Sequence, residues 1–188
     1  MSLKEMSDPI KDLVDEHILI SRWINVLEEE VKTMDMRSKI KQELFRTVVD
    51  FFEDYTHKIH HGKEEQVLFD RLEDKRIDVQ DKVIIDDLIL EHVSAGIKVD
   101  NLSKAVEEWT PGESNATQYV KSKLYDLVLF YPDHMEREEK RFFERAMKYF
   151  NDDEREEILE EFTLFDDSEL EDMFTEIISE LEKEYDIE

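Results

Sequence analysis

His61-Gly62-Lys63-Glu64-Glu65 and, later in the chain, His134-Met135-Glu136-Arg137-Glu138 share one pattern. In each stretch a histidine is followed four residues later by a glutamate, and this spacing places both side chains on one face of a helix. Apolar residues follow each stretch, at 67–69 and at 142–143. Histidine nitrogens and carboxylate oxygens at the edge of an apolar core indicate a metal ion bound inside a helix bundle.

The composition favours an all-α protein. The chain has 188 residues, of which 40% are charged, and only three glycines and three prolines interrupt it. Leucine, isoleucine, glutamate and lysine at helical spacing are typical of helices. This length suits one domain, or one domain with a small appendage, and allows a buried core.

Charge and cysteine content exclude several classes of protein. The formal net charge of −26 repels the phosphates of nucleic acids and anionic lipids, so neither is an expected partner. Without cysteine the chain has no disulfide, no thiolate metal site and no cysteine-ligated iron–sulfur cluster. No apolar run reaches the length of a membrane span, and the N-terminal residues lack a signal-peptide core. We therefore expect a cytoplasmic protein.

Apolar residues recur every three or four positions in four long segments. The first starts at Ser7-Asp8-Pro9, a capping side chain followed by proline. The second runs from about Lys39 to Glu73, after a polar break. The third follows a short turn at 77–80 and stops at Thr110-Pro111-Gly112, and the fourth begins near Ser114. Four such helices joined by short turns predict an up-down-up-down four-helix bundle.

One histidine lies on the apolar seam of each predicted helix, where an aliphatic residue is expected. These histidines are His17, His61, His92 and His134. A single seam histidine is usually a hydrogen-bonded core residue. Four on separate helices, two of them followed by a glutamate, favour a metal site instead. Glu65 and Glu138 also favour a metal site, because a buried carboxylate without a compensating cation costs on the order of several kcal/mol.

Taken in order, these motifs resemble the hemerythrin-like (HHE cation-binding) domain. The resemblance rests on Asp15-Glu16-His17, on residues 60–69, on Glu91-His92, and on His134 with Glu138. It implies a hemerythrin-type four-helix bundle over residues 1–150 with two non-haem iron ions, bridged by the two glutamates and by an oxo or hydroxo group. Carried over residue by residue, the implied ligands are His17, His61, Glu65, His92, His134 and Glu138.

A seventh ligand is left open. Gly96 stands where hemerythrin has a further histidine, and residues 37–39 (Arg-Ser-Lys) stand where related repair proteins have theirs. His57 lies one turn before His61 on roughly the same face and is the candidate that we favour. His60, rotated by about 100° from His61, is the alternative. If neither binds, one iron keeps an open or water-filled position.

Residues 151–188 lie outside the resemblance. Asn151-Asp152-Asp153 predicts a new helix start, and apolar stripes around Phe162 and Phe174 need to be covered. We expect an acidic helical extension that packs either on the bundle or on a partner chain. In the second case the protein would form a homodimer.

The resemblance implies a protein that binds oxygen or another small diatomic ligand, as a carrier or as a sensor. A histidine-rich site disfavours the oxygen cleavage of carboxylate-rich enzymes, which use a Glu-x-x-His spacing where this chain has His-x-x-x-Glu. We therefore expect a metal- and oxygen-binding protein rather than a catalyst. The alternatives are a di-iron enzyme of nitric oxide or peroxide handling or of iron–sulfur cluster repair, and a structural bundle with another divalent metal.

Overall fold

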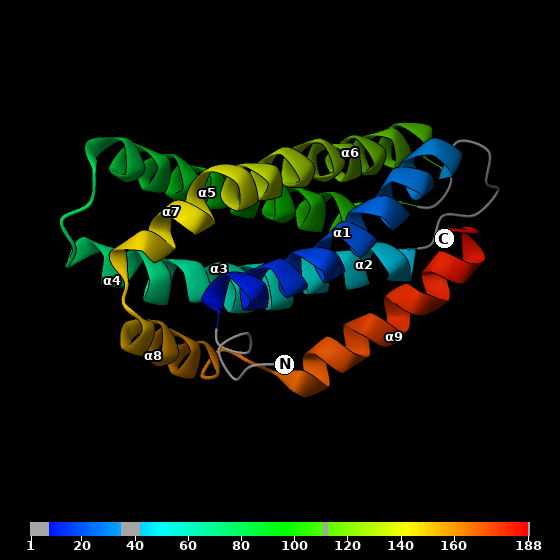
Figure 1. The fold of residues 1–188 in the computed structure, drawn as a ribbon. Helices are drawn as coiled ribbons and strands as arrows, with labels where there is room; N and C mark the ends of the chain where they lie inside the picture. The colour runs from blue at the N-terminus through cyan, green and yellow to red at the C-terminus, as the bar shows by residue number, and fades with distance from the viewer. Residues whose placement is uncertain (1–7, 35–41, 111–112, 188) are drawn as a thin grey trace.

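The computed structural model describes residues 8–34, 42–110 and 113–187. Within these ranges the chain is almost entirely helical and has no β-strand, which confirms the prediction of an all-α protein (Figure 1). The predicted cap at Ser7, the predicted helix start at Lys39 and the predicted stop at Pro111-Gly112 lie outside the described residues. No described helix combines the length and the apolar character that crossing a membrane requires.

The first helix, α1 (Pro9–Thr33), begins where the sequence predicts. The Asp8 carboxylate accepts a hydrogen bond from the backbone N–H of Ile10 at 3.1 Å, and Pro9 occupies the first turn. This cap satisfies one of the N–H groups that lack a partner inside the helix. One face of α1 is buried and carries His17 among apolar side chains, so the helix presents this histidine to the interior.

The second helical segment, residues 42–73, changes its hydrogen-bonding pattern along its length. It consists of α2 (Gln42–Asp50), η3 (Phe51–His60), α3 (His61–Lys63), η4 (Glu64–Phe69) and α4 (Asp70–Glu73). The stretches η3 and η4 are π-helical, so each N–H bonds a carbonyl five residues back instead of four. A π-helix therefore has more residues per turn, and side chains beyond Phe51 point in directions that a 3.6-residue period does not predict.

The third and fourth segments follow the predicted pattern more closely. Helix α5 (Val79–Glu107) begins inside the turn predicted at 77–80. Helix α6 (Ser114–Arg137) continues through Pro132. It is followed by the π-helical η5 (Glu138–Phe143), the short α7 (Glu144–Ala146) and the 3-10 turn η6 (Met147–Tyr149).

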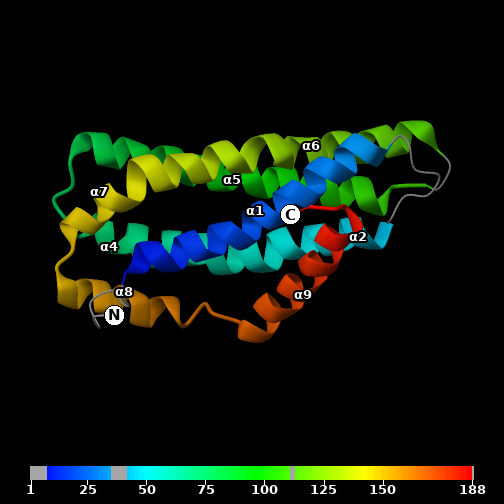
Figure 2. The same ribbon diagram turned by 45° about the vertical axis from the view of Figure 1, so that its right-hand side comes forward.

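The four segments surround a common interior (Figures 1 and 2). Helix α1 packs against α6 and η3, and α5 packs against α6 and α2. Two apolar clusters fill the interior, one centred on Trp23, Phe51 and Tyr131 and the other on Leu68 and Phe142. Along every segment the buried histidines, and the buried glutamates other than Glu30, lie near the boundary between the two clusters, so a polar layer crosses the middle of the bundle.

The C-terminal extension folds back on its own chain. It consists of α8 (Asp152–Phe162) and α9 (Ser168–Glu184), and Asn151 caps α8 through a reciprocal capping box with Glu154. The side chain of Phe162 joins one apolar cluster of the bundle, and Phe174 joins the other. The extension thus covers α1 and the second helical segment.

Ion pairs border these apolar contacts. Arg22 on α1 pairs with Glu182 on α9 at 2.7 Å, and Arg71 on α4 pairs with Glu161 on α8 at 2.7 Å. Pairs on the protein surface contribute about 0–1 kcal/mol each. Buried apolar side chains therefore provide most of the free energy that holds the extension in place.

Truncation of Phe174 tests this docking. The Phe174 ring lies 5.2 Å from the ring of Phe51 and 5.9 Å from that of Trp23, centroid to centroid, and the side chain is buried. We expect Phe174→Ala to lower the free energy of unfolding by about 3–5 kcal/mol, measured by urea denaturation with circular dichroism. The neighbouring Met173→Ala, at an exposed position, is the control. A loss for Phe174→Ala no larger than the control's would contradict the packing of α9 on the bundle.

Candidate metal centre

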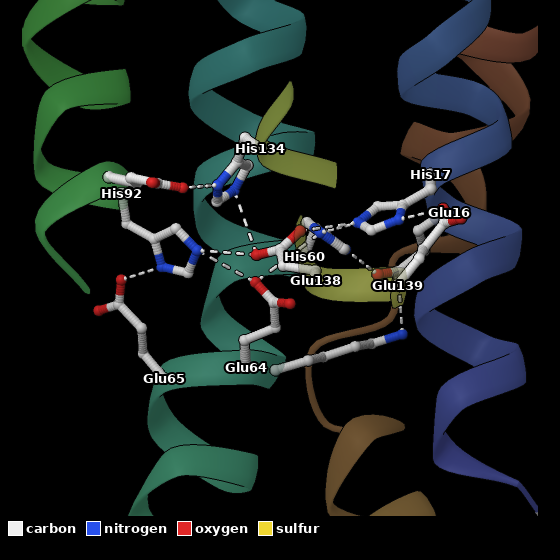
Figure 3. Close-up of polar contacts among 11 residues, drawn as sticks. Glu16, His17, His60, Glu64, Glu65, His92, His134, Glu138 and Glu139 are labelled. Carbon is white, nitrogen blue, oxygen red and sulfur yellow. Dashed lines mark hydrogen bonds and ion pairs between the residues drawn. The ribbon is translucent and has the colours of Figure 1, made fainter. Parts of the chain in front are cut away.

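Seven histidine and glutamate side chains from the four segments meet in the polar layer. Figure 3 labels all of them except His61. They are His17, His60, His61, Glu64, His92, His134 and Glu138. Each is 5% exposed or less. We call these seven residues the central cluster.

The carboxylate of Glu138 lies at the middle of the central cluster. Its Oε2 is 3.2 Å from Nε2 of His17. Its Oε1 is 3.4 Å from Nε2 of His92 and 3.2 Å from Nε2 of His134. The two oxygens of one side chain therefore face histidines from different helices (Figure 3).

A second buried carboxylate belongs to Glu64 on η4. Its Oε2 is 3.3 Å from Nε2 of His92 and 3.8 Å from Nε2 of His60. Both Glu64 and Glu138 are fully buried. The cluster thus contains two carboxylates, each surrounded by imidazole rings.

Four further glutamates surround the central cluster and accept hydrogen bonds from the outer ring nitrogens. Glu139 accepts from Nδ1 of His17 at 2.9 Å, and Glu65 accepts from Nδ1 of His92 at 2.6 Å. In the same way Nδ1 of His60 bonds Glu16 at 2.7 Å, and Nδ1 of His134 bonds Glu91 at 2.8 Å. Because an ionised carboxylate only accepts, the proton sits on Nδ1 and each Nε2 is left to point inward.

The buried groups also shift one another's pKa values. Burial alone lowers the pKa of His17, but nearby carboxylates, led by Glu138, outweigh it and raise the pKa to about 9. The same balance raises the pKa of His92 to about 11. Burial lowers the pKa of the other three cluster histidines. The carboxylates thus attract positive charge, which protons or a metal ion can supply.

The donor atoms fit a bound metal. Several buried atoms make no hydrogen bond, among them Nε2 of His61, Nε2 of His134 and both side-chain oxygens of Glu64. Buried polar atoms without partners are costly, and coordination to a metal satisfies them. The ligating atoms of His61, His92 and His134 lie within 4.8 Å of one another, as do those of His17, His60 and Glu138. Imidazole nitrogen and carboxylate oxygen suit iron and related transition metals.

The structure brings together most of the residues proposed from sequence. His17, His61, His92, His134 and Glu138 all lie in the central cluster. Glu65 does not: its side chain is 42% exposed, and it bonds the outer nitrogen of His92. The place predicted for Glu65 among the inner donors is taken by Glu64, one residue earlier.

His57, the favoured seventh ligand, lies beside the cluster rather than in it. Its ring lies 5.1 Å from that of His61, and its Nε2 makes no hydrogen bond. Among the described residues, no group of three close donors includes His57. His60, the alternative, lies within hydrogen-bonding distance of His17, with their Nε2 atoms 3.0 Å apart.

The sequence contains a repeat from which the inward positions of His60 and Glu64 could have been predicted. Residues 60–69 (His-His-Gly-Lys-Glu-Glu-Gln-Val-Leu-Phe) and 134–143 (His-Met-Glu-Arg-Glu-Glu-Lys-Arg-Phe-Phe) align without a gap. This alignment matches His60 with His134, and the pair Glu64-Glu65 with Glu138-Glu139. The structure obeys the same repeat, because the first glutamate of each pair is buried in the cluster and the second bonds a histidine of another helix.

A cavity of about 240 Å³ lies beside the cluster, between the second helical segment and α5. His61 and His92 form part of its wall, together with His57 and Val93. Gly96 lies nearby, and a Cβ at this position would be 3.7 Å from Cε1 of His57. Small molecules can therefore approach two of the clustered histidines from this side.

Comparison with curated proteins and with solved structures gives no match for this chain. The sequence model of the hemerythrin HHE cation-binding domain, by contrast, matches residues 8–146. The match spans all four helical segments of the bundle and every residue of the central cluster, and it ends before α8. The chain therefore belongs to the hemerythrin HHE cation-binding domain family.

Proposed function

We propose that this chain is an up-down-up-down bundle of the hemerythrin type that binds two iron ions in the central cluster and, through them, oxygen or a related diatomic molecule. The observation that carries the proposal is the position of the Glu138 carboxylate. One of its oxygens faces His17, and the other faces His92 and His134. A carboxylate with imidazoles on both sides is suited to two neighbouring cations that share it.

The proposed ligands are the seven residues of the central cluster. His17 and His60 group with Glu138, while His61, His92 and His134 form a second group. The ligating atoms of Glu64 lie close to His60 and His61 and also to His92 and Glu138, so this carboxylate lies between the two groups.

This set differs at two positions from the one that we favoured from the sequence. His60 takes the seventh position for which His57 was favoured, and Glu64 takes the position of Glu65. The support is burial and orientation: His60 and Glu64 are buried and contact other cluster residues, whereas Glu65 reaches solvent. Glu65 keeps a role in the proposal as the acceptor that orients His92.

Bound iron supplies a centre to which a small ligand coordinates, and the residues of the chain supply its surroundings. The two carboxylates would offset part of the charge of the ions, and the five imidazoles would supply nitrogen donors. The outer glutamates fix the orientations of His17, His60, His92 and His134. The adjacent cavity, about 240 Å³ in volume, is smaller than sites for drug-sized ligands, which are roughly 300–1,000 Å³. Its size favours a small ligand.

Iron content tests the proposal. We expect protein purified in air to hold about two iron ions per chain and to show the near-ultraviolet charge-transfer absorption of a bridged iron pair. Addition of azide, a small anion that binds open iron positions, is expected to change this absorption. Less than about one iron per chain, with no such absorption, would overturn the di-iron proposal. Preferential retention of zinc in competition with iron would favour a structural bundle instead.

Rapid mixing separates binding from catalysis. The reduced, iron-loaded protein is mixed with oxygen in a stopped-flow spectrometer and then placed under vacuum. We expect the spectrum to return to that of the reduced form, because a histidine-rich site favours reversible binding. Continued oxygen consumption in the presence of a reductant would instead indicate an enzyme.

A further inference from the structure

Lys63 is a buried cation on the second helical segment, immediately beyond the clustered histidines. Its side chain is 2% exposed. The ammonium nitrogen lies 2.8 Å from Asp12, 2.5 Å from Glu16 and 2.6 Å from Asp166. An ammonium group has three N–H donors, so these three carboxylates match its full hydrogen-bonding capacity.

These contacts connect the C-terminal extension to the metal centre. Asp166 belongs to the linker between α8 and α9 (residues 163–167), and Glu16 belongs to α1. Glu16 uses one oxygen to accept from Lys63 and the other to accept from Nδ1 of His60 at 2.7 Å. The path from the extension to a cluster histidine is therefore Asp166, Lys63, Glu16 and His60, in that order.

A second, apolar contact joins the same linker to the same place. A Cβ atom at Gly62 would lie only 2.8 Å from Cδ1 and Cε1 of Phe165. The Phe165 ring therefore lies directly on the backbone between His61 and Lys63, where any larger residue would displace it. Both contacts come from the linker, and both reach the part of the helix that carries the cluster.

We propose that the linker 163–167 positions the metal centre, with Lys63 as the positioning residue that holds Glu16 against His60, so that metal binding and docking of the extension are coupled. This inference rests on the proposed metal binding. The physical reason is that Glu16 orients His60 only while its own carboxylate is held in place. Loss of an outer partner of a metal-binding histidine typically lowers metal affinity by about 10–100-fold.

Two matched variants test the coupling. Asp166 and Glu161 both belong to the extension and both pair with a cation of the second helical segment, and their side chains are 49% and 42% exposed. Only the partner of Asp166 contacts a residue that bonds a cluster histidine. We therefore expect Asp166→Asn to weaken cobalt(II) affinity by about tenfold, while Glu161→Gln stays within about twofold of the unmodified protein.

The measurement is competition for cobalt(II) between the full-length protein and a chelating dye, with the visible cobalt absorption as a second readout. Asp166→Glu, which keeps the charge, is expected to restore affinity. Phe165→Ala is expected to weaken binding as well, whereas Leu164→Ala, at an exposed position, is not. Thermal unfolding of each metal-free variant measures its stability. A loss of metal affinity can then be distinguished from a loss of folded protein.

Coupling must also act in the reverse direction. We expect cobalt binding to slow hydrogen exchange of the backbone amides of residues 163–167 more than that of the C-terminal half of α9. Equal affinity of Asp166→Asn and the unmodified protein, or equal losses in Asp166→Asn and Glu161→Gln, would overturn the coupling while leaving the metal site intact. Absence of metal binding by the unmodified protein would overturn the proposed function itself.

Discussion

Glu138→Gln is expected to lose at least one metal ion per chain and to lower metal affinity by more than about 100-fold, since loss of an outer partner alone costs about 10–100-fold. Glu138 is fully buried and contacts histidines of three helices. The substitution keeps the shape of the side chain but removes its charge, and an amide nitrogen cannot coordinate a metal as a carboxylate oxygen does.

Metal analysis together with far-ultraviolet circular dichroism gives the readout for Glu138→Gln. The helical signal is expected to remain, because an isosteric amide preserves the packing around position 138. Glu136→Gln, an exposed change two residues earlier on the same segment, is the control and is expected to bind metal normally. A Glu138→Gln variant with full iron content and unchanged absorption would exclude Glu138 as a ligand.

The second prediction distinguishes the roles of Glu64 and Glu65, the two adjacent glutamates of the second helical segment. We expect Glu64→Gln to lose as much bound metal as Glu138→Gln, because Glu64 is buried among the cluster imidazoles. Glu65→Gln is expected to retain both ions with affinity lower by about 10–100-fold, because Glu65 only orients His92.

The two variants can be compared in one titration with iron(II) under anaerobic conditions, scored by the number of ions bound and by their affinity. The reverse outcome, an empty site in Glu65→Gln and a full one in Glu64→Gln, would restore the ligand set implied by the family resemblance. Since the two substitutions are chemically identical and adjacent, a general effect of lost charge cannot account for a difference between them.

Most of the fold could be predicted from the sequence. Proline after a capping aspartate located the start of α1, and the turn predicted at 77–80 located the start of α5. Period-3.6 patterns work for α1, α5 and α6 because most of their length is regular α-helix. The same patterns located His17, His92 and His134, which all lie in the central cluster.

In the second helical segment the sequence could not decide which of two neighbouring side chains points inward. Glu64 and Glu65 are adjacent, and a rotation error of one residue exchanges them. His60 and His61 are adjacent as well, but both lie in the central cluster, which the spacing did not predict. The π-helical stretches η3 and η4 alter the rotation per residue exactly across this region. The internal repeat between residues 60–69 and 134–143 contained the correct register, but helical periodicity alone did not reveal it.

By itself, then, the sequence determined most of the helices, the family and one histidine on the apolar seam of each long segment, since these follow from spacing and composition. Only the tertiary structure decided that His60 and Glu64 face inward, that Glu65 is an outer acceptor, and that Lys63 joins the extension to the centre. Those features depend on the rotation of one helix and on contacts between residues more than a hundred positions apart, such as Lys63 and Asp166. Local sequence patterns do not encode such contacts.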